Sequence, residues 1–331
     1  MYLLYYFLYY LTQFTKKNKI EFKKKISLNY KKMKKAKQIC PNFNDIIIST
    51  KTIIGYSNLN VKIQDIFNNI ETTDYVVIKK KRGRKKKKEV VNPNPHLKDG
   101  DIITLKYQDF LKGVDLKAKG KANSSGKKKF FRNAITVVMF LDNKLVNFKI
   151  SENGKFQITG CKSDTQAINT IKLFWNRVSS YYPTLKLKVT FLTVMTNIDF
   201  NLGFIVNREN LDKYINRMTE YNSLLETSFG YTGVNIKFPI EEKIDMDLHV
   251  IEWNGEKWNQ SSALYSNFIN TFSDKDRKKI LNKKRYNTFL VFHSGNVIMS
   301  GMVTKYMINV YNHFIDITKQ ARNEIEEKLE S

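Results

Sequence analysis

Two short segments of the chain alternate apolar and polar residues and carry nearly the same pattern. Residues 153–160 read Asn-Gly-Lys-Phe-Gln-Ile-Thr-Gly, and residues 294–301 read Ser-Gly-Asn-Val-Ile-Met-Ser-Gly. Each copy is a turn glycine, four strand residues, a hydroxyl residue and a second glycine, and an apolar strand-like run precedes each. A repeated strand of this kind indicates an internal duplication.

The alternation assigns one face of the sheet to each side chain, because successive residues of a strand point to opposite sides. The residues expected to face a core are Phe156 and Ile158 in the first copy and Val297 and Met299 in the second. The residues expected on the other face are Lys155, Gln157 and Thr159 in the first copy and Asn296, Ile298 and Ser300 in the second. A sheet face of small hydroxyls and aliphatics needs a partner that covers it.

A helix with one apolar face is predicted directly after each copy. Ser163 and Gln166 have the spacing of a capping box, and Thr304 is the expected N-cap of the second helix. The apolar faces are Ala167, Ile168, Ile171, Phe174, Trp175 and Val178 in the first helix and Met307, Ile308, Val310, Tyr311, Phe314 and Ile315 in the second. The sequence therefore predicts a duplicated α+β domain with an antiparallel sheet.

The charge of the chain is concentrated in two segments. The 331 residues include 57 Lys and Arg against 31 Asp and Glu, a formal net charge of +26. Residues 1–40 carry +10 and residues 79–129 carry +13, which leaves only +3 for the rest of the chain. Such an excess indicates a polyanionic partner, either nucleic acid or an acidic membrane surface.

Residues 79–129 read as a solvated insertion without a full core of their own, because they combine a basic run with Pro- and Gly-rich stretches. Their Arg82-Gly83-Arg84 core resembles the minor-groove AT-hook, although Lys85 stands where that motif has proline. A nuclear-targeting or non-specific phosphate-binding run is the simpler interpretation. The apolar segment 1–11 is too short for a spanning helix, which needs about 20 residues.

The motifs of common enzyme classes are absent from the sequence. Two cysteines exclude a disulfide scaffold, the four histidines have no helical zinc spacing, and no P-loop, dinucleotide or nucleophile-elbow motif occurs. Asp245 and Asp247 are the nearest carboxylate pair, and a solvated loop is the simpler interpretation of them. We expect no catalysis, no cofactor and no metal.

The repeated segments resemble the TATA-box-binding protein family, in particular its divergent versions in large DNA viruses. Residues 290–301 read Leu-Val-Phe-His-Ser-Gly-Asn-Val-Ile-Met-Ser-Gly, similar to the family pattern L-x-F-x-S-G-K-x-x-x-T-G. Residues 154–155 and 159–163 match the same pattern, and residues 231–237 are similar to the aromatic-x-G strand of the second repeat. The resemblance covers about two thirds of the chain: residues 45–78, 130–238 and 285–320.

The resemblance implies an α+β saddle with a pseudo-twofold repeat. Its curved antiparallel sheet of about ten strands lays a concave face on the DNA minor groove, with helices on the convex face. The expected organisation is a basic tail at 1–40, a first repeat at 41–187 with the insertion 79–129, and a second repeat at 188–331. Residues 239–284 form a second insertion, where the family has a short stirrup loop that borders the DNA.

The resemblance also assigns residues to the DNA. Phe292 and Tyr231 fall on an intercalating aromatic pair, whereas the first-repeat positions, near Asn133 or Ala134 and on Ser151, are not aromatic. This predicts an asymmetric bend, kinked at the second-repeat end only. The candidate DNA-binding residues are Lys155, Gln157, Thr159, Asn197, Tyr231, Asn235, Leu290, Phe292, Ile298 and Ser300.

The function expected from these features is a sequence-preferring transcription initiation factor that binds and bends A/T-rich promoter DNA. The alternative is a non-specific nucleic-acid-binding structural or packaging protein of the same fold. The resemblance implies general transcription factors and the RNA polymerase machinery as partners, a monomer, and no membrane. It implies an intracellular location, in the nucleus, a viral replication compartment or the virion.

Overall fold

The computed structural model describes residues 40–77, 93–116, 132–225 and 233–328. Its first half contains β1 (Ile48–Ser57), α2 (Ile63–Asn69), β2 (Ile102–Tyr107), β3 (Phe110–Gly113), β4 (Ala134–Leu141), β5 (Lys144–Ser151), β6 (Lys155–Cys161) and α3 (Asp164–Val178). The second half contains β7 (Lys188–Asn201), α4 (Arg208–Met218), β8 (Asn222–Leu225), β9 (Gly233–Pro239), β12 (Tyr286–Phe292), β13 (Asn296–Gly301), α7 (Thr304–Gln320) and α8 (Arg322–Ile325). Between β9 and β12 lie β10 (Asp247–Trp253), β11 (Trp258–Leu264), α5 (Tyr265–Ile269) and α6 (Asp274–Leu281).

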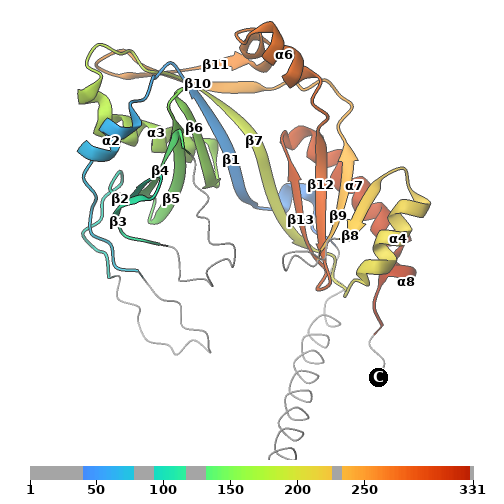
Figure 1. The fold of residues 1–331 in the computed structure, drawn as a ribbon. Helices are drawn as coiled ribbons and strands as arrows, with labels where there is room; N and C mark the ends of the chain where they lie inside the picture. The colour runs from blue at the N-terminus through green and yellow to red at the C-terminus, as the bar shows by residue number, and fades with distance from the viewer. Residues whose placement is uncertain (1–39, 78–92, 117–131, 226–232, 329–331) are drawn as a thin grey trace, which may run out of the picture.

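All these strands belong to one antiparallel sheet with β1 and β7 paired at its centre (Figure 1). Outward from β1 the order is β6, β5, β4, β2 and β3, and outward from β7 it is β13, β12, β9 and β8. Leaving out β3 and the β10–β11 hairpin, the two halves therefore have the same strand order about the central pair. The sheet has 13 strands rather than the expected ten, because β3, β10 and β11 are additions.

The turn between the last two strands has the same geometry in both halves. In both halves a glycine donates a hydrogen bond to the carbonyl three residues earlier, Gly154 to Ser151 and Gly295 to Phe292, each over 2.9 Å. The φ angles of the two glycines are +71° and +79°, in the left-handed region that favours glycine. A Cβ at Gly154 would also collide with the carbonyl oxygen of Leu59, so the turn requires glycine for two reasons.

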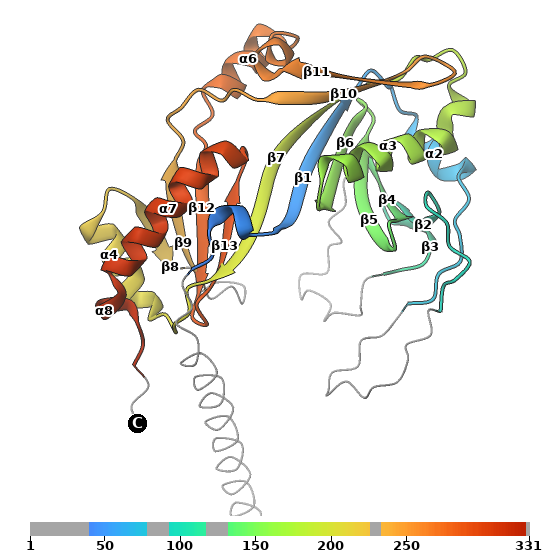
Figure 2. The same cartoon turned by 180° about the vertical axis from the view of Figure 1, so that it is seen from behind.

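Helices cover one face of the sheet. In Figure 1, α3 and α7 lie behind the strands, and Figure 2 shows the same helices in front when the molecule is seen from behind. Two separate cores lie between these helices and the sheet, one in each half. The predicted apolar face of α3 is confirmed, because Ala167, Ile168, Ile171, Phe174, Trp175 and Val178 are all buried. In α7, Met307, Tyr311, Phe314 and Ile315 are buried and the predicted Ile308 and Val310 are partly buried.

The start of each long helix was predicted from its capping residues, with different outcomes. Ser163 caps α3 as expected, since its Oγ accepts the Gln166 N–H over 3.2 Å. In α7, however, the N-cap is Val303, and Thr304 is the first helical residue. The Val303 carbonyl accepts the first helical hydrogen bonds, so the prediction of Thr304 as the cap was wrong by one residue.

The interpretation of residues 79–129 as a solvated insertion was wrong for part of its length. Residues 102–107 form β2, which pairs with β4 and buries Ile102, Ile103 and Leu105. The high charge of the whole segment concealed this short apolar run, which has enough hydrophobic area to join the sheet. The basic run itself, from Lys79 to Lys88, lies outside the described residues.

The insertion at 239–284 joins the two halves. Its strand β10 pairs with the N-terminal half of β7, in the register Val250 opposite Thr190 and Ile251 opposite Val189. Ile251 is buried in the core of the first half, although the insertion belongs to the second. The insertion connects β9 to β12 at the end of this strand pair where Pro239 lies opposite Tyr286. Phe292 and Gly233 lie at the other end of the pair. The insertion therefore does not border the position of the predicted wedge.

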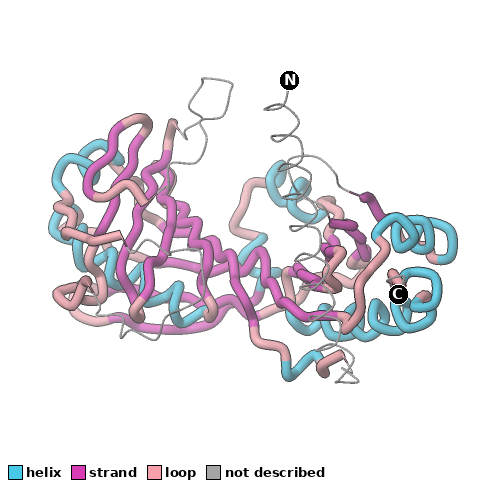
Figure 3. Tube along the Cα trace, turned by 90° about the horizontal axis from the view of Figure 1, so that it is seen from below, coloured by secondary structure: helices cyan, strands magenta, loops and turns pink. Residues whose placement is uncertain are grey.

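The other face of the sheet, opposite the two cores, is called the open face here. It carries the alternate residues of each strand, such as Thr52, Thr159, Ile298 and Ser300, which the registers place on one side. Seen from below, the sheet is curved and the long helices lie along one side of it (Figure 3). Among the described residues, no long helix like α3 or α7 covers the open face, and the insertion packs only on its margin around Tyr56 and Leu192.

Candidate nucleic-acid interface

The first-half candidates lie together on the open face. Lys155, Gln157 and Thr159 are exposed on β6, and their neighbours Phe156 and Ile158 are buried on the opposite face, as the alternation predicted. On the adjoining strand β5, Asn147 pairs with Thr159, and Lys149 pairs with Gln157. The Thr159 hydroxyl donates to the Asn147 carbonyl over 3.3 Å, which leaves its lone pairs free. This patch offers hydroxyl, amide and ammonium groups on a rigid strand.

The second-half candidates form a matching patch. The register aligns Leu290 with Ile298 on one side and with Asn235 on the other, so these three side chains form a row across β13, β12 and β9. Ser300 lies in the next row, opposite Asn197 of β7. All are partly exposed, while the intervening Phe289, Val291, Val297 and Met299 are buried. The patch therefore combines aliphatic surface with short polar groups.

Asn197 lies at the centre of the open face. Its Nδ2 donates to the Thr50 hydroxyl over 3.1 Å, whereas its Oδ1 is buried without a hydrogen-bond partner among the described residues. Exchanging the two amide atoms would let Thr50 donate to Oδ1 and would leave an N–H free. In either orientation one polar atom of the buried amide has no partner among the described residues, which is costly for a buried polar group.

Phe292 ends β12 at the outer part of the open face. It lies opposite Gly233, and an open hollow of about 880 Å³ beside it is lined also by Asp199, Asn201, His293, Asn296 and Ile298, among others. Its predicted partner Tyr231 lies outside the described residues, so the structure does not place the aromatic pair. Phe292 itself lies at the end of its strand and on the open side of the sheet.

The corresponding end of the first half has no aromatic side chain at the paired positions. Ser151 ends β5 as Phe292 ends β12, and it lies directly opposite Ala134 of β4. Phe148 is fully buried on the helix side, as are Val146 and Ile150 at the same spacing along β5. Phe130 and Phe131 lie outside the described residues.

Several open-face residues were missed by the sequence analysis. A bulge in β7 between the pairs Ile53–Thr193 and Thr52–Met195 leaves Val194 without a partner on β1. Val194 and Met195 are 36 % and 38 % exposed, which places apolar surface at the centre of the face. Alternation along β1 could have indicated Thr52, but no sequence signal indicated the bulge.

The charge on the open face is positive. The registers place Lys106, Lys149, Lys155 and Lys237 on it. The registers also place the carboxylates of Asp199 and Glu252 on this face; Asp199 Oδ2 accepts a hydrogen bond from the Ser49 hydroxyl over 2.7 Å, and Glu252 lies opposite Lys188. An excess of lysine over acid on an uncovered sheet face suits a polyanion.

The described ranges contain neither a candidate metal cluster nor a helix that could span a membrane. Among the described residues, no group of three or more His, Cys, Asp or Glu side chains is arranged to hold a metal ion. Asp245 and Asp247 are exposed at the start of β10, and the Asp245 N–H donates to the Tyr306 hydroxyl over 3.3 Å. No helix in the described ranges is both long and apolar enough to cross a membrane.

Comparison with known proteins gives one sequence relative and a set of structural neighbours. No family model matches the chain. It is 27 % identical over 306 residues to the uncharacterized protein 335L of Invertebrate iridescent virus 6, covering 85 % of this chain and 86 % of the relative. Among solved structures, TBP of Methanococcus jannaschii is similar with a TM-score of 0.39 and 14 % identity, covering 85 % of this chain and 99 % of that one.

Proposed function

We propose that this protein binds A/T-rich duplex DNA in the minor groove through the open face of a duplicated, saddle-shaped sheet, and that it acts in transcription initiation. The observation that carries the proposal is the open face itself. Among the described residues, only its margin at Tyr56 and Leu192 is covered, and the rest is positively charged and made of short hydroxyl and amide groups between aliphatic side chains. The minor groove presents few acceptors and one donor between sugar walls, which suits small donors and aliphatics.

The duplication is supported by equivalent hydrogen bonds as well as by strand order. The backbone N–H of Val61 donates to the Glu152 carbonyl over 2.8 Å, and that of Val206 donates to the His293 carbonyl over 2.9 Å. In each half this bond ties the segment before the first helix to the turn between the last two strands. Two open-face patches related in this way would contact two successive stretches of one duplex.

The test is a binding titration of the full chain with A/T-rich and G/C-rich duplexes of equal length at two salt concentrations. We expect at least tenfold tighter binding of the A/T-rich duplex at both, because each unsuitable base pair costs about 1–3 kcal/mol. Equal affinities with a steep loss at higher salt would contradict the proposal. That result would favour the alternative, a structural or packaging protein that binds phosphates without regard to sequence.

The end position of Phe292 gives a prediction for DNA bending. Changing Phe292→Ala should remove the kink at the second-half end, because no aromatic side chain would enter the base step there. Circular-permutation gel shifts should then show a smaller bend angle than with the unchanged protein, whereas Phe292→Tyr should keep it. A bend that is unchanged by the alanine variant would exclude Phe292 as the wedge.

A further inference from the structure

The helices of the insertion lie on the open face, not on the helix-covered face. Tyr56 faces the open side, since the register places it in one row with Lys155 and Thr190. The rings of Phe268 in α5 and of Phe272 just after it contact Tyr56 edge-on, with centroids 5.1 Å and 5.7 Å away. These contacts fix α5 over the open-face ends of β1 and β7.

A small core of its own holds this part of the insertion in place. Leu192 of β7, on the open face, is buried together with Leu248, Tyr265, Ile269 and Met302. The Arg285 guanidinium donates to the Tyr265 hydroxyl over 3.0 Å, and burial raises the pKa of that phenol. These contacts therefore hold the insertion in a fixed position along one margin of the open face.

The charges of the insertion are balanced in number but separated along the chain. Residues 241–256 contain six acidic residues and one lysine, whereas residues 277–285 contain six Lys and Arg and no acid. Outside the two basic segments at 1–40 and 79–129 the chain carries only +3, so apart from 277–285 that remainder has a negative net charge. Within that remainder, residues 277–285 therefore supply the excess of positive charge.

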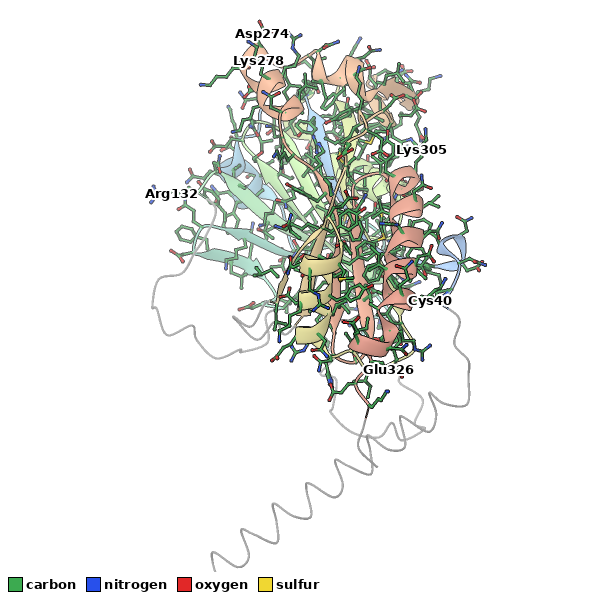
Figure 4. The ribbon with its side chains drawn as sticks, turned by 90° about the vertical axis from the view of Figure 1, so that its right-hand side faces the viewer. Cys40, Arg132, Asp274, Lys278, Lys305 and Glu326 are labelled. Atoms are coloured by element: carbon green, nitrogen blue, oxygen red, sulfur yellow. The ribbon has the colours of Figure 1, made fainter. Side chains whose placement is uncertain are left out.

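Four lysines within residues 277–285 are free to bind an anion. Lys278, Lys279, Lys283 and Lys284 are exposed, and none of them forms an ion pair within the part of the chain that the structure describes. Glu241, Glu242, Lys283 and Lys284 all line one groove of about 530 Å³, and no ion pair joins these glutamates to these lysines in the described part of the chain. Figure 4 shows Lys278 at the top of the molecule, on the side away from α7 and its Lys305.

The basic segment continues directly into the open face. Arg285 is followed by Tyr286, which is 40 % exposed and belongs to the open-face series of β12 with Thr288 and Leu290. The Lys237 ammonium lies 5.9 Å from the centre of the Tyr286 ring. Lysines next to an exposed aromatic ring at the margin of a nucleic-acid face are suited to the sugar-phosphate backbone.

We propose that residues 277–285 form a phosphate-binding wall that grips one backbone of the duplex lying on the open face. This inference rests on the proposed function and adds to it a contact from the insertion. The wall stands on one margin of the sheet only, so it would hold the duplex from one side. Phosphate contacts fix register and orientation and carry no sequence information themselves.

The test compares two variants of the full chain with equal charge. One carries Lys→Gln at Lys278, Lys279, Lys283 and Lys284, and the other carries Lys→Gln at Lys213, Lys305, Lys319 and Lys328, which lie on α4, on α7 and near the C-terminal end. For each we would measure affinity for the A/T-rich duplex over a range of salt concentrations. Thermal unfolding checks that both variants fold.

The wall variant should bind at least tenfold more weakly at low salt, and the slope of log affinity against log salt should become shallower by roughly 2–4, since each lost phosphate contact removes about 0.9. The control variant should keep nearly the original slope. Both variants should keep the preference of the unchanged protein for A/T-rich over G/C-rich duplex. Equal slopes for the two variants would overturn the wall while leaving the proposed function intact, whereas an unchanged protein that binds no duplex would overturn both.

Discussion

Replacing Thr159 and Ser300 together by glutamate is expected to lower affinity for A/T-rich duplex by about 100-fold or more. The two residues lie on β6 and β13, one in each half of the open face, and both are accessible. Each change removes a hydroxyl group and places a carboxylate where DNA phosphates and base acceptors would come close. A loss of about 3 kcal/mol corresponds to that factor, and like charges brought together at an interface cost several kcal/mol.

The matched control puts the same charges on the helix-covered side. Asn176→Glu and Asn312→Glu change two exposed neutral residues of α3 and α7. Fluorescence anisotropy should show affinity within about threefold of the unchanged protein for this control, because the added charges lie far from the duplex. If both double variants lost affinity equally, net charge rather than the open face would determine binding.

Changing Phe314→Ala should destabilise the protein by about 3–5 kcal/mol, the largest stability effect that we expect from one substitution. Phe314 is fully buried in the second-half core and stacks on Phe289 with ring centroids 4.0 Å apart and planes 14° apart. It also meets Phe200 and Phe238 edge-on, so its removal leaves a cavity that rigid aromatic neighbours cannot fill. The midpoint of thermal unfolding should fall by roughly 5–15 °C.

Phe110→Ala is the control for that change, since it removes the same side chain from a surface position. Phe110 is 62 % exposed at the end of the β2–β3 hairpin, where only a tilted contact with Phe67 holds it. Its loss should lower stability by less than about 1 kcal/mol. Equal shifts in the two unfolding midpoints would show that the core around α7 is packed less tightly than the ring contacts indicate.

The elements with strong periodicity were predictable, because periodicity reports burial directly. Lys155, Gln157 and Thr159 are exposed and Phe156 and Ile158 are buried, as alternation required. The apolar face of α3 and its Ser163 cap follow from the local sequence in the same way. These features depend on neighbours a few residues away along the chain.

The features that the sequence analysis missed have two causes: averaging charge over a long segment, and pairing between strands that are far apart in the chain. The strand β2 was overlooked because its four buried residues lie within a segment of high net charge. The Val194 bulge depends on how β7 pairs with β1, more than a hundred residues away in the chain. The insertion at 239–284 lies between β9 and β12 as expected, but no local pattern indicated that its strand β10 pairs with β7.

The sequence by itself determined the two strand-and-helix units, the faces of their strands and the composition of the open face, since these follow from side-chain alternation and local capping. Only the tertiary structure decided that Asn197 meets Thr50 at the centre and that α5 packs on Tyr56. It also brought the basic residues 277–285 to one margin of the open face. Contacts of that kind join residues far apart in the chain, and they depend on strand register and packing that no local pattern encodes.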